Sequence, residues 1–307
     1  MRDAFVKQLN KLAEKDKKIF FITADLGFGV FDEFSKRFPN QYLNVGVAEQ
    51  NMTGIATALA LEGRKVFTYS IANFATLRCL EQIRNDASYH EANITIVASG
   101  GGFTYGGLGM SHHATEDIAI MRALPGIRVV APCTAWETFH ATRALAFSKG
   151  VNYLRIEKGG DKKPPKKNTN FRIGRAIEMM PGKDITIIAT GGILKECIKA
   201  SKTLLKDNIF AQVVSMHSIK PLDEKFIRDC ARKTKRIITV EEHNKIGGLG
   251  SAVSEVLSQN NLDCHLKVIA LDDVFSSVVG SQDYLRSLYK LDHKEIIKSA
   301  KKMLKND

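Results

Sequence analysis

Glu49 is the residue whose type and position best suit acid–base chemistry in this sequence. A run of apolar and small residues, 53–61, follows it and ends near Gly63, which predicts a buried helix with a glycine stop. No Lys or Arg lies within ten residues of Glu49 on either side. The helix N-terminus favours the charged carboxylate, whereas burial favours the neutral acid. Glu49 is therefore a candidate for proton transfer, although a glutamate that only caps the helix fits the same pattern.

Two adjacent histidines, His112 and His113, end a stretch at 100–113 that is rich in glycine. So many glycines predict a loop with unusual backbone angles, which lets the backbone approach a ligand closely. Neighbouring side chains of an extended loop point to opposite sides, so the two imidazoles and Glu116 are poorly spaced for one metal ion. We therefore expect no metal site on this chain.

Asp25 follows an apolar run at 18–25 that reads as a buried strand, and Leu26 continues the turn. Ligands of α/β proteins gather at the carboxyl ends of strands, so this turn is expected near a site. An aspartate that simply starts a turn is an equal alternative. A further pattern, at 70–84, places Phe74 on an apolar helical stripe, for which core packing is the default.

The segment Gly46-Val-Ala-Glu49-Gln, followed by a helix of small residues, resembles the transketolase family. In that family the corresponding glutamate activates thiamine diphosphate through a hydrogen bond to N1′ of the aminopyrimidine. Such a carboxyl group must lie in an apolar pocket, because an exposed one would bond to water instead. The resemblance thus implies a catalytic role for Glu49.

The resemblance also implies cofactor contacts. The turn of Asp25 and Leu26 corresponds to one that lies beside the thiazolium, and Phe74 corresponds to an aromatic residue on the pyrimidine ring. Ile71 stands where a second aromatic is often found. An aliphatic side chain there still covers the ring, with a loss of about 0.5–1.5 kcal/mol of stacking.

Substrate contacts are implied as well. His112 takes the position of a catalytic histidine that faces substrate oxygens, and Arg155 resembles an arginine that binds substrate phosphate. Arg78 has the same possible role, with a plain surface arginine as the alternative. Leu108 replaces an aspartate that reads a substrate hydroxyl in many transketolases. A substrate hydroxyl would lose a polar contact there, which argues against assuming ordinary pentose and hexose phosphates as substrates.

Strand and helix patterns alternate along the chain, which predicts an α/β fold with two parallel-sheet domains. A polar stretch with prolines, 161–172, is the expected linker. By resemblance, residues 1–160 form the pyrimidine-binding domain and residues 173–307 form the transketolase C-terminal domain. Strands are expected near 18–25, 65–69, 93–99, 127–132, 151–156, 184–189, 211–216, 236–240 and 267–271.

Composition limits the other possibilities. The 307 residues, 44% hydrophobic, suffice for about two domains, and no apolar run is long enough for a membrane span. The five cysteines form no CxxC pair, which favours a reducing cytoplasm over a disulfide or zinc framework. The chain has a net charge of +12, but its lysines are not interleaved with aromatic residues, so a nucleic-acid partner is not expected. A solvated surface, or a face that meets acidic partners and phosphorylated substrates, fits this charge better.

The family's diphosphate motif, Gly-Asp-Gly, does not occur in this sequence. The resemblance therefore implies an N-terminal transketolase subunit as partner, which would hold the diphosphate and a Mg²⁺ or Ca²⁺ ion, with self-association into a heterotetramer. The implied activity is transfer of a two-carbon ketol unit between sugars or sugar phosphates. The alternatives are a deoxyxylulose-phosphate-synthase-like or 2-oxo-acid-dehydrogenase β-type subunit, and a non-catalytic assembly subunit.

Overall fold

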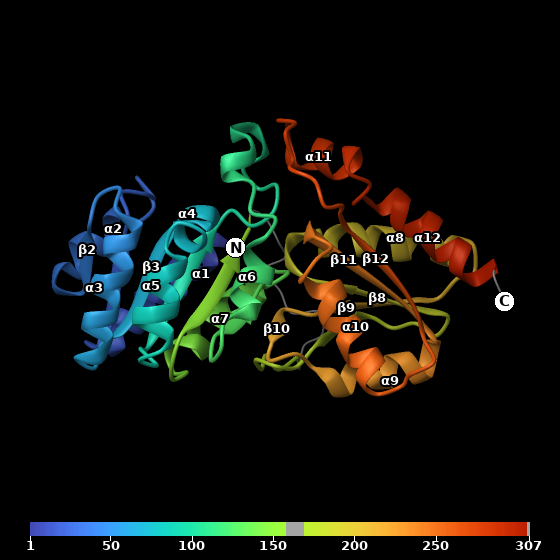
Figure 1. Cartoon of the computed structure of the whole chain (residues 1–307), viewed down its shortest axis with the longest axis horizontal. Coiled ribbons are helices and arrows are strands. Elements are labelled where there is room, and N and C mark those ends of the chain that lie inside the picture. The colour runs from blue at the N-terminus through green and yellow to red at the C-terminus, as the bar shows by residue number, and fades with distance from the viewer. Residues whose placement is uncertain (158–168, 306–307) are drawn as a thin grey trace.

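The structure is a computed structural model and describes residues 1–157 and 169–305. Most of the expected linker, 161–168, lies outside the described residues. Two α/β halves lie side by side, one from each half of the chain (Figure 1). The predicted fold class is confirmed. In the two described ranges, no helix has the length and apolar character that crossing a membrane requires.

The first sheet has seven strands in the order β10-β5-β6-β4-β3-β1-β2. All its pairings are parallel except the one between β10 and β5. Successive side chains of a strand point to opposite faces, so Phe21 joins one buried cluster and Ile22 the other. The strands are β1 (Ile19–Thr23), β2 (Tyr42–Asn44), β3 (Lys65–Ile71), β4 (Ile94–Ser99), β5 (Arg128–Val130), β6 (Asn152–Ile156) and β10 (Ser218–Lys220).

Helices cover both faces of this sheet. The helices α1 and α7 contact each other on the face with the aromatic cluster, and α3 contributes small side chains to the other face. The first-half helices are α1 (Arg2–Lys15), α2 (Asp32–Arg37), α3 (Glu49–Leu61), α4 (Ala72–Thr76), α5 (Leu80–Gln82), α6 (Asp117–Ala123) and α7 (Ala135–Ala146). The buried helix predicted behind Glu49 is confirmed.

The single helix predicted for 70–84 is wrong. The chain leaves α4 at Thr76, turns at 77–79, resumes as α5 and then widens into a π-helical turn at Ile83–Ser88. At the turn the Arg78 N–H reaches the Asn73 carbonyl at 3.4 Å, one residue farther back than in an α-helix. The break exposes Leu77, which the apolar stripe would have buried, and reorients Arg78.

The second sheet has five strands in the order β12-β11-β8-β9-β7, and its edge strand β7 is antiparallel. Neither β7 nor β10 is predicted, because each is short and lacks a continuous apolar run. The strands are β7 (Ile177–Met180), β8 (Ile185–Ala189), β9 (Ala211–Ser215), β11 (Arg236–Asn244) and β12 (His265–Leu271). The helices are α8 (Leu194–Lys206), α9 (Glu224–Thr234), α10 (Leu249–Gln259), α11 (Gln282–Leu288) and α12 (His293–Lys305).

A buried ionic network joins the two halves. Arg155, on β6, is 1% exposed. Its Nε donates to Asp117 Oδ2 at 2.8 Å and its Nη1 donates to Glu157 Oε1 at 2.7 Å. Its Nη2 donates to two carbonyls, one of them that of Glu242 on β11. Each nitrogen of the guanidinium therefore donates to a partner inside the protein.

Arg286, on α11, extends the network. Its Nε donates to Glu242 Oε2 at 2.6 Å, and Glu242 Oε1 accepts from the Phe103 N–H at 2.5 Å. The glycine-rich loop is thereby fixed to the second half of the chain. Burial raises the pKa of Glu157 to about 7, since Arg155 offsets only part of the desolvation cost and Glu242 adds like charge.

We predict that Arg155→Met lowers the free energy of unfolding by about 3–5 kcal/mol, because it leaves buried carboxylates without their counter-charge. Urea denaturation of the isolated chain measures the change. The control is Arg232→Met, whose side chain is 66% exposed, with an expected effect within about 0.5 kcal/mol. Equal effects of the two substitutions would show that the network does not stabilise the fold.

Candidate active site

The site is built at the ends of neighbouring parallel strands. Asn44, the last residue of β2, accepts from the N–H groups of Asp25 and Gly46 at 2.9 and 3.0 Å, and its Nδ2 donates to Asp25 Oδ1 at 3.1 Å. Asp25 has φ 52° and Gly46 has φ 71°, so both turns use the left-handed region. One amide therefore holds the turn of Asp25 beside the segment that leads into α3.

Glu49 is the first residue of α3 and is 1% exposed. Ser70 Oγ, near the end of β3, donates to Glu49 Oε1 at 3.0 Å. Arg78 Nη1 donates to Glu49 Oε2 at 2.6 Å, and the two side chains form an ion pair in which the Arg78 side chain is 41% exposed. Glu49 is thus buried as predicted, and it has a basic neighbour although no Lys or Arg lies within ten residues of it in sequence. The partner lies 29 residues away in sequence and reaches Glu49 because the helix breaks.

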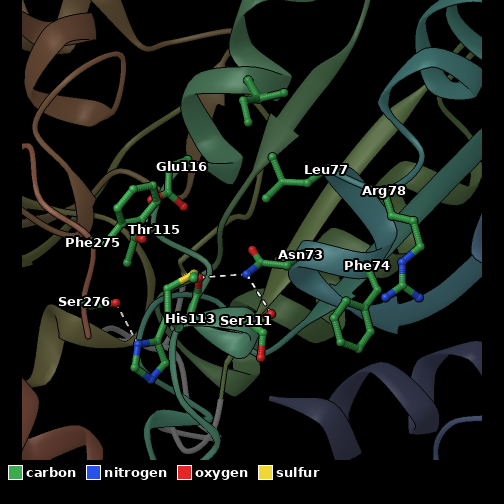
Figure 2. Close-up of a pocket in the computed structure, with 12 residues that line it drawn as sticks. Asn73, Phe74, Leu77, Arg78, Ser111, His113, Thr115, Glu116, Phe275 and Ser276 are labelled. Atoms are coloured by element: carbon green, nitrogen blue, oxygen red, sulfur yellow. Dashed lines mark hydrogen bonds between the residues drawn. The ribbon is translucent and has the colours of Figure 1, made fainter. Parts of the chain in front are cut away.

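Phe74 connects this ion pair to the histidine loop. The Arg78 Cζ lies 4.2 Å from the centre of the Phe74 ring, and the two side chains lie together in Figure 2. The His112 ring meets the Phe74 ring edge-on, with 5.2 Å between centres. The structure therefore brings together four predicted site residues in a continuous chain of contacts: Glu49, Arg78, Phe74 and His112.

The remaining cofactor candidates are placed less directly. Ile71 ends β3, three residues before Phe74, and is partly buried. Leu26 packs against the aromatic cluster of the first half, so its side chain serves the core at least in part. Asp25 lies at the same edge of the sheet as Glu49, held through Asn44.

The loop has the unusual backbone angles that its glycines predict, with φ 95° at Gly100 and 83° at Gly109. Asn73, on α4, fixes its end: Nδ2 donates to the carbonyls of Ser111 and His113 at 3.1 and 2.9 Å (Figure 2). The amide orientation follows from these two bonds, because carbonyl oxygens only accept. Asn73 Oδ1 is buried and has no hydrogen-bond partner.

The two histidines have different surroundings. His113 is buried, with Nδ1 2.7 Å from Ser276 Oγ and Nε2 3.1 Å from the Gly106 carbonyl oxygen, so it ties the loop to the second half. His112 is half-buried and its Nδ1 lies 3.0 Å from Ser111 Oγ. Burial, and then the neighbouring His113, lower the pKa of His112, so its imidazole is neutral near pH 7. Across the two described ranges, no group of three His, Cys, Asp or Glu side chains could hold a metal ion.

A cleft of about 460 Å³ adjoins the site at the junction of the two halves. Phe74 and Arg78 line one side, Thr115 and Glu116 another, and Phe275 closes it from the second half (Figure 2). Its walls are mostly apolar, with a few polar groups among them. This combination is typical of small-molecule sites.

Arg155 does not belong to this site. Sequence reasoning assigned it to substrate phosphate, but its guanidinium is sealed among Asp117, Glu157 and two carbonyls. The structure contradicts that assignment, because a fully paired and buried guanidinium cannot reach a ligand. Sequence reasoning in turn missed Ser70, Asn44 and Asn73. The signal for Ser70 was its position near the end of a buried strand, where ligands gather.

Comparison with known proteins identifies the family of both halves of the chain. The family description "Transketolase, pyrimidine binding domain" matches residues 1–160, and "Transketolase, C-terminal domain" matches residues 174–296. A putative transketolase C-terminal section from Methanocaldococcus jannaschii is 38% identical over 100% of this chain and 97% of that protein.

Two further relatives are close in length and structure. One of the subunits of an apulose-4-phosphate transketolase from Phocaeicola vulgatus is 37% identical over 99% of this chain and 97% of that protein. A solved structure described as a split gene transketolase, inactive beta4 tetramer, is 35% identical, covers 99% of this chain and 98% of its own, and superposes with a TM-score of 0.91. The chain therefore belongs to the transketolase family and carries its pyrimidine-binding and C-terminal domains.

Proposed function

We propose that this chain is the C-terminal subunit of a thiamine diphosphate-dependent transketolase, which transfers a two-carbon ketol unit between sugars. One observation carries the proposal: a buried carboxylate, Glu49, and an aromatic ring, Phe74, both contact one flat nitrogenous group, the Arg78 guanidinium. The relatives that this chain spans almost end to end are named as parts of transketolases, which supports the same activity.

The residues present fit the aminopyrimidine of thiamine diphosphate. That base needs a carboxyl group for its ring nitrogen and flat apolar cover for its faces, and Glu49, Phe74 and Ile71 provide these. The Arg78 guanidinium supports this fit, because its Nη1 bonds to Glu49 and its Cζ lies over the Phe74 ring. When bound, thiamine diphosphate supplies the electron sink for the two-carbon unit.

Each residue of the chain then has a defined task. Glu49 shares a proton with the ring nitrogen of the base, and burial strengthens that hydrogen bond. Ser70 orients the carboxyl group from the other oxygen. His112, neutral near pH 7 and braced by Phe74, hydrogen-bonds substrate oxygens. Arg78, which remains partly exposed, binds the anionic end of the substrate.

We further propose that the substrates are anionic sugars. One relative is named for apulose-4-phosphate and another, from Clostridium sp., for 6-deoxy-6-sulfo-D-fructose; the second is 35% identical over 98% of this chain. Both names contain an anionic group, and this chain has a net charge of +12. Leu108 is exposed on the loop and offers no hydrogen bond to a sugar hydroxyl.

The diphosphate and its Mg²⁺ or Ca²⁺ ion would be held by a partner, the N-terminal transketolase subunit, in a heterotetramer. The relative from Phocaeicola vulgatus is named as one subunit of its transketolase, which supports this arrangement. We place the assembly in the cytoplasm, since the five cysteines are all unpaired thiols.

Other members of the wider family offer an alternative activity. A 1-deoxy-D-xylulose-5-phosphate synthase from Desulforudis audaxviator is 33% identical over 97% of this chain, which spans 47% of that protein. Carbon dioxide release from pyruvate by the assembled enzyme would favour the synthase activity or a 2-oxo-acid-dehydrogenase activity. Absence of any turnover would favour a non-catalytic assembly subunit.

We predict that Glu49→Gln retains thiamine diphosphate binding in the assembled enzyme but slows exchange of the cofactor's C2 proton by about 10²- to 10⁴-fold, because general acid–base assistance is lost. Quenched-flow exchange into D₂O, read by proton NMR, measures the rate. The matched control is Glu62→Gln at the exposed other end of α3, which should exchange at the wild-type rate. An unchanged rate in the Glu49 variant would falsify the proposed role.

A second prediction concerns pH. The pKa of His112 is lowered, so the folded chain binds this proton less readily than the unfolded chain does. NMR titration of the His112 ring should give a midpoint below the ordinary value of 6.5 in the folded chain and near 6.5 in urea. A His112→Asn variant assigns the resonance. A folded midpoint at or above 6.5 would contradict the lowered pKa of His112.

A further inference from the structure

We propose that Arg78 is an internal stand-in for the cofactor's base. In the chain alone, its guanidinium contacts both Glu49 and Phe74. When the base binds, the guanidinium leaves Glu49 and turns toward the anionic end of the substrate. This inference rests on the proposed function and adds to it a residue that controls cofactor affinity.

The first argument is chemical likeness. A guanidinium is planar, with N–H donors along its edge and π faces above and below. Arg78 uses both: Nη1 donates to Glu49 Oε2 at 2.6 Å, and Cζ lies 4.2 Å from the centre of the Phe74 ring. An aminopyrimidine presents the same two features, a polar edge and aromatic faces. The two groups would therefore compete for the same carboxylate and the same ring.

The second argument is that Arg78 bonds to the carboxylate oxygen that does not accept from Ser70. Ser70 Oγ donates to Glu49 Oε1 at 3.0 Å from a fully buried position, so that oxygen belongs to the scaffold. Arg78 takes Oε2. Glu49 is at the start of α3 and its side chain is 1% exposed. A ring nitrogen that bonds to Oε2 must therefore compete with Arg78 for this oxygen.

The third argument is that Arg78 is free to leave. Its side chain is 41% exposed, whereas that of Glu49 is 1% exposed. It belongs to the turn at 77–79 between two short helices, so a swing requires side-chain rotation rather than a helix shift. The cleft of about 460 Å³ that Arg78 lines gives the guanidinium room.

Arg78 should therefore change two measurable properties in opposite directions: it raises the stability of the chain alone and lowers its affinity for the base. While no base is bound, Arg78 stabilises the chain, because a buried Glu49 carboxylate without a counter-charge is costly. Whatever stabilisation Arg78 gives to the unloaded site must be lost when the base binds, so it weakens binding by the same amount. Binding of the cofactor then depends on the contacts that the partner subunit makes with the diphosphate.

The test uses Arg78→Gln and a matched control, Arg84→Gln, an exposed arginine on the following turn that bonds to Asn85. Urea denaturation is measured on the chain alone, and thiamine diphosphate binding is measured by calorimetry on the chain assembled with its N-terminal subunit. We expect Arg78→Gln to unfold at lower urea and to bind thiamine diphosphate about tenfold more tightly than wild type, within the usual range of coupling between sites. Arg84→Gln should change neither property.

A second variant, Arg78→Lys, covers the case in which Arg78→Gln does not fold. Lysine keeps a counter-charge for Glu49 but lacks the planar face, so it should fold and still bind the cofactor more tightly than wild type. Equal or weaker binding by the variants that fold would overturn the stand-in role and leave the proposed function intact. Failure of the wild-type assembly to bind thiamine diphosphate would instead overturn both.

Discussion

The burial of one charged group, the Glu49 carboxylate, constrains the rest of the site. A carboxylate removed from water must find donors, and in this chain it finds the hydroxyl of Ser70 and the guanidinium of Arg78. The N-terminus of α3 adds a partial positive charge, which also favours the carboxylate. Because the carboxyl group is fixed in this way, whatever replaces Arg78 must offer a donor edge of similar shape.

A second ionic cluster shows that the degree of burial distinguishes an ion pair that stabilises the fold from one that a ligand can reach. Arg155 and Arg286 are also paired with carboxylates, but both guanidiniums are almost fully enclosed and lie at the junction of the two halves. Arg78 makes a similar contact from a partly exposed position. The same chemistry therefore stabilises the fold in one place and remains available to a ligand in the other, and exposure is what distinguishes them.

The glycine-rich loop links these two clusters. Added Cβ atoms at Gly101 and Gly102 would lie 2.6 Å from atoms of Arg155 and Glu242, so the loop needs glycine to pack over the buried network. Its far end is held by Asn73, from the helix that also carries Phe74. The position of His112 thus depends on both the interdomain network and the short helix α4.

The sequence by itself determined the α/β class, most of the helices and strands, and the burial of Glu49 at a helix start, because these depend on local apolar patterns. Tertiary structure alone decided that Arg78 pairs with Glu49, that Arg155 is sealed away, and that β10 joins the sheet of the other half. These outcomes depend on contacts between residues far apart in sequence. No local pattern records which distant donor will reach a buried acid, since that is fixed only when the packed elements bring the two together.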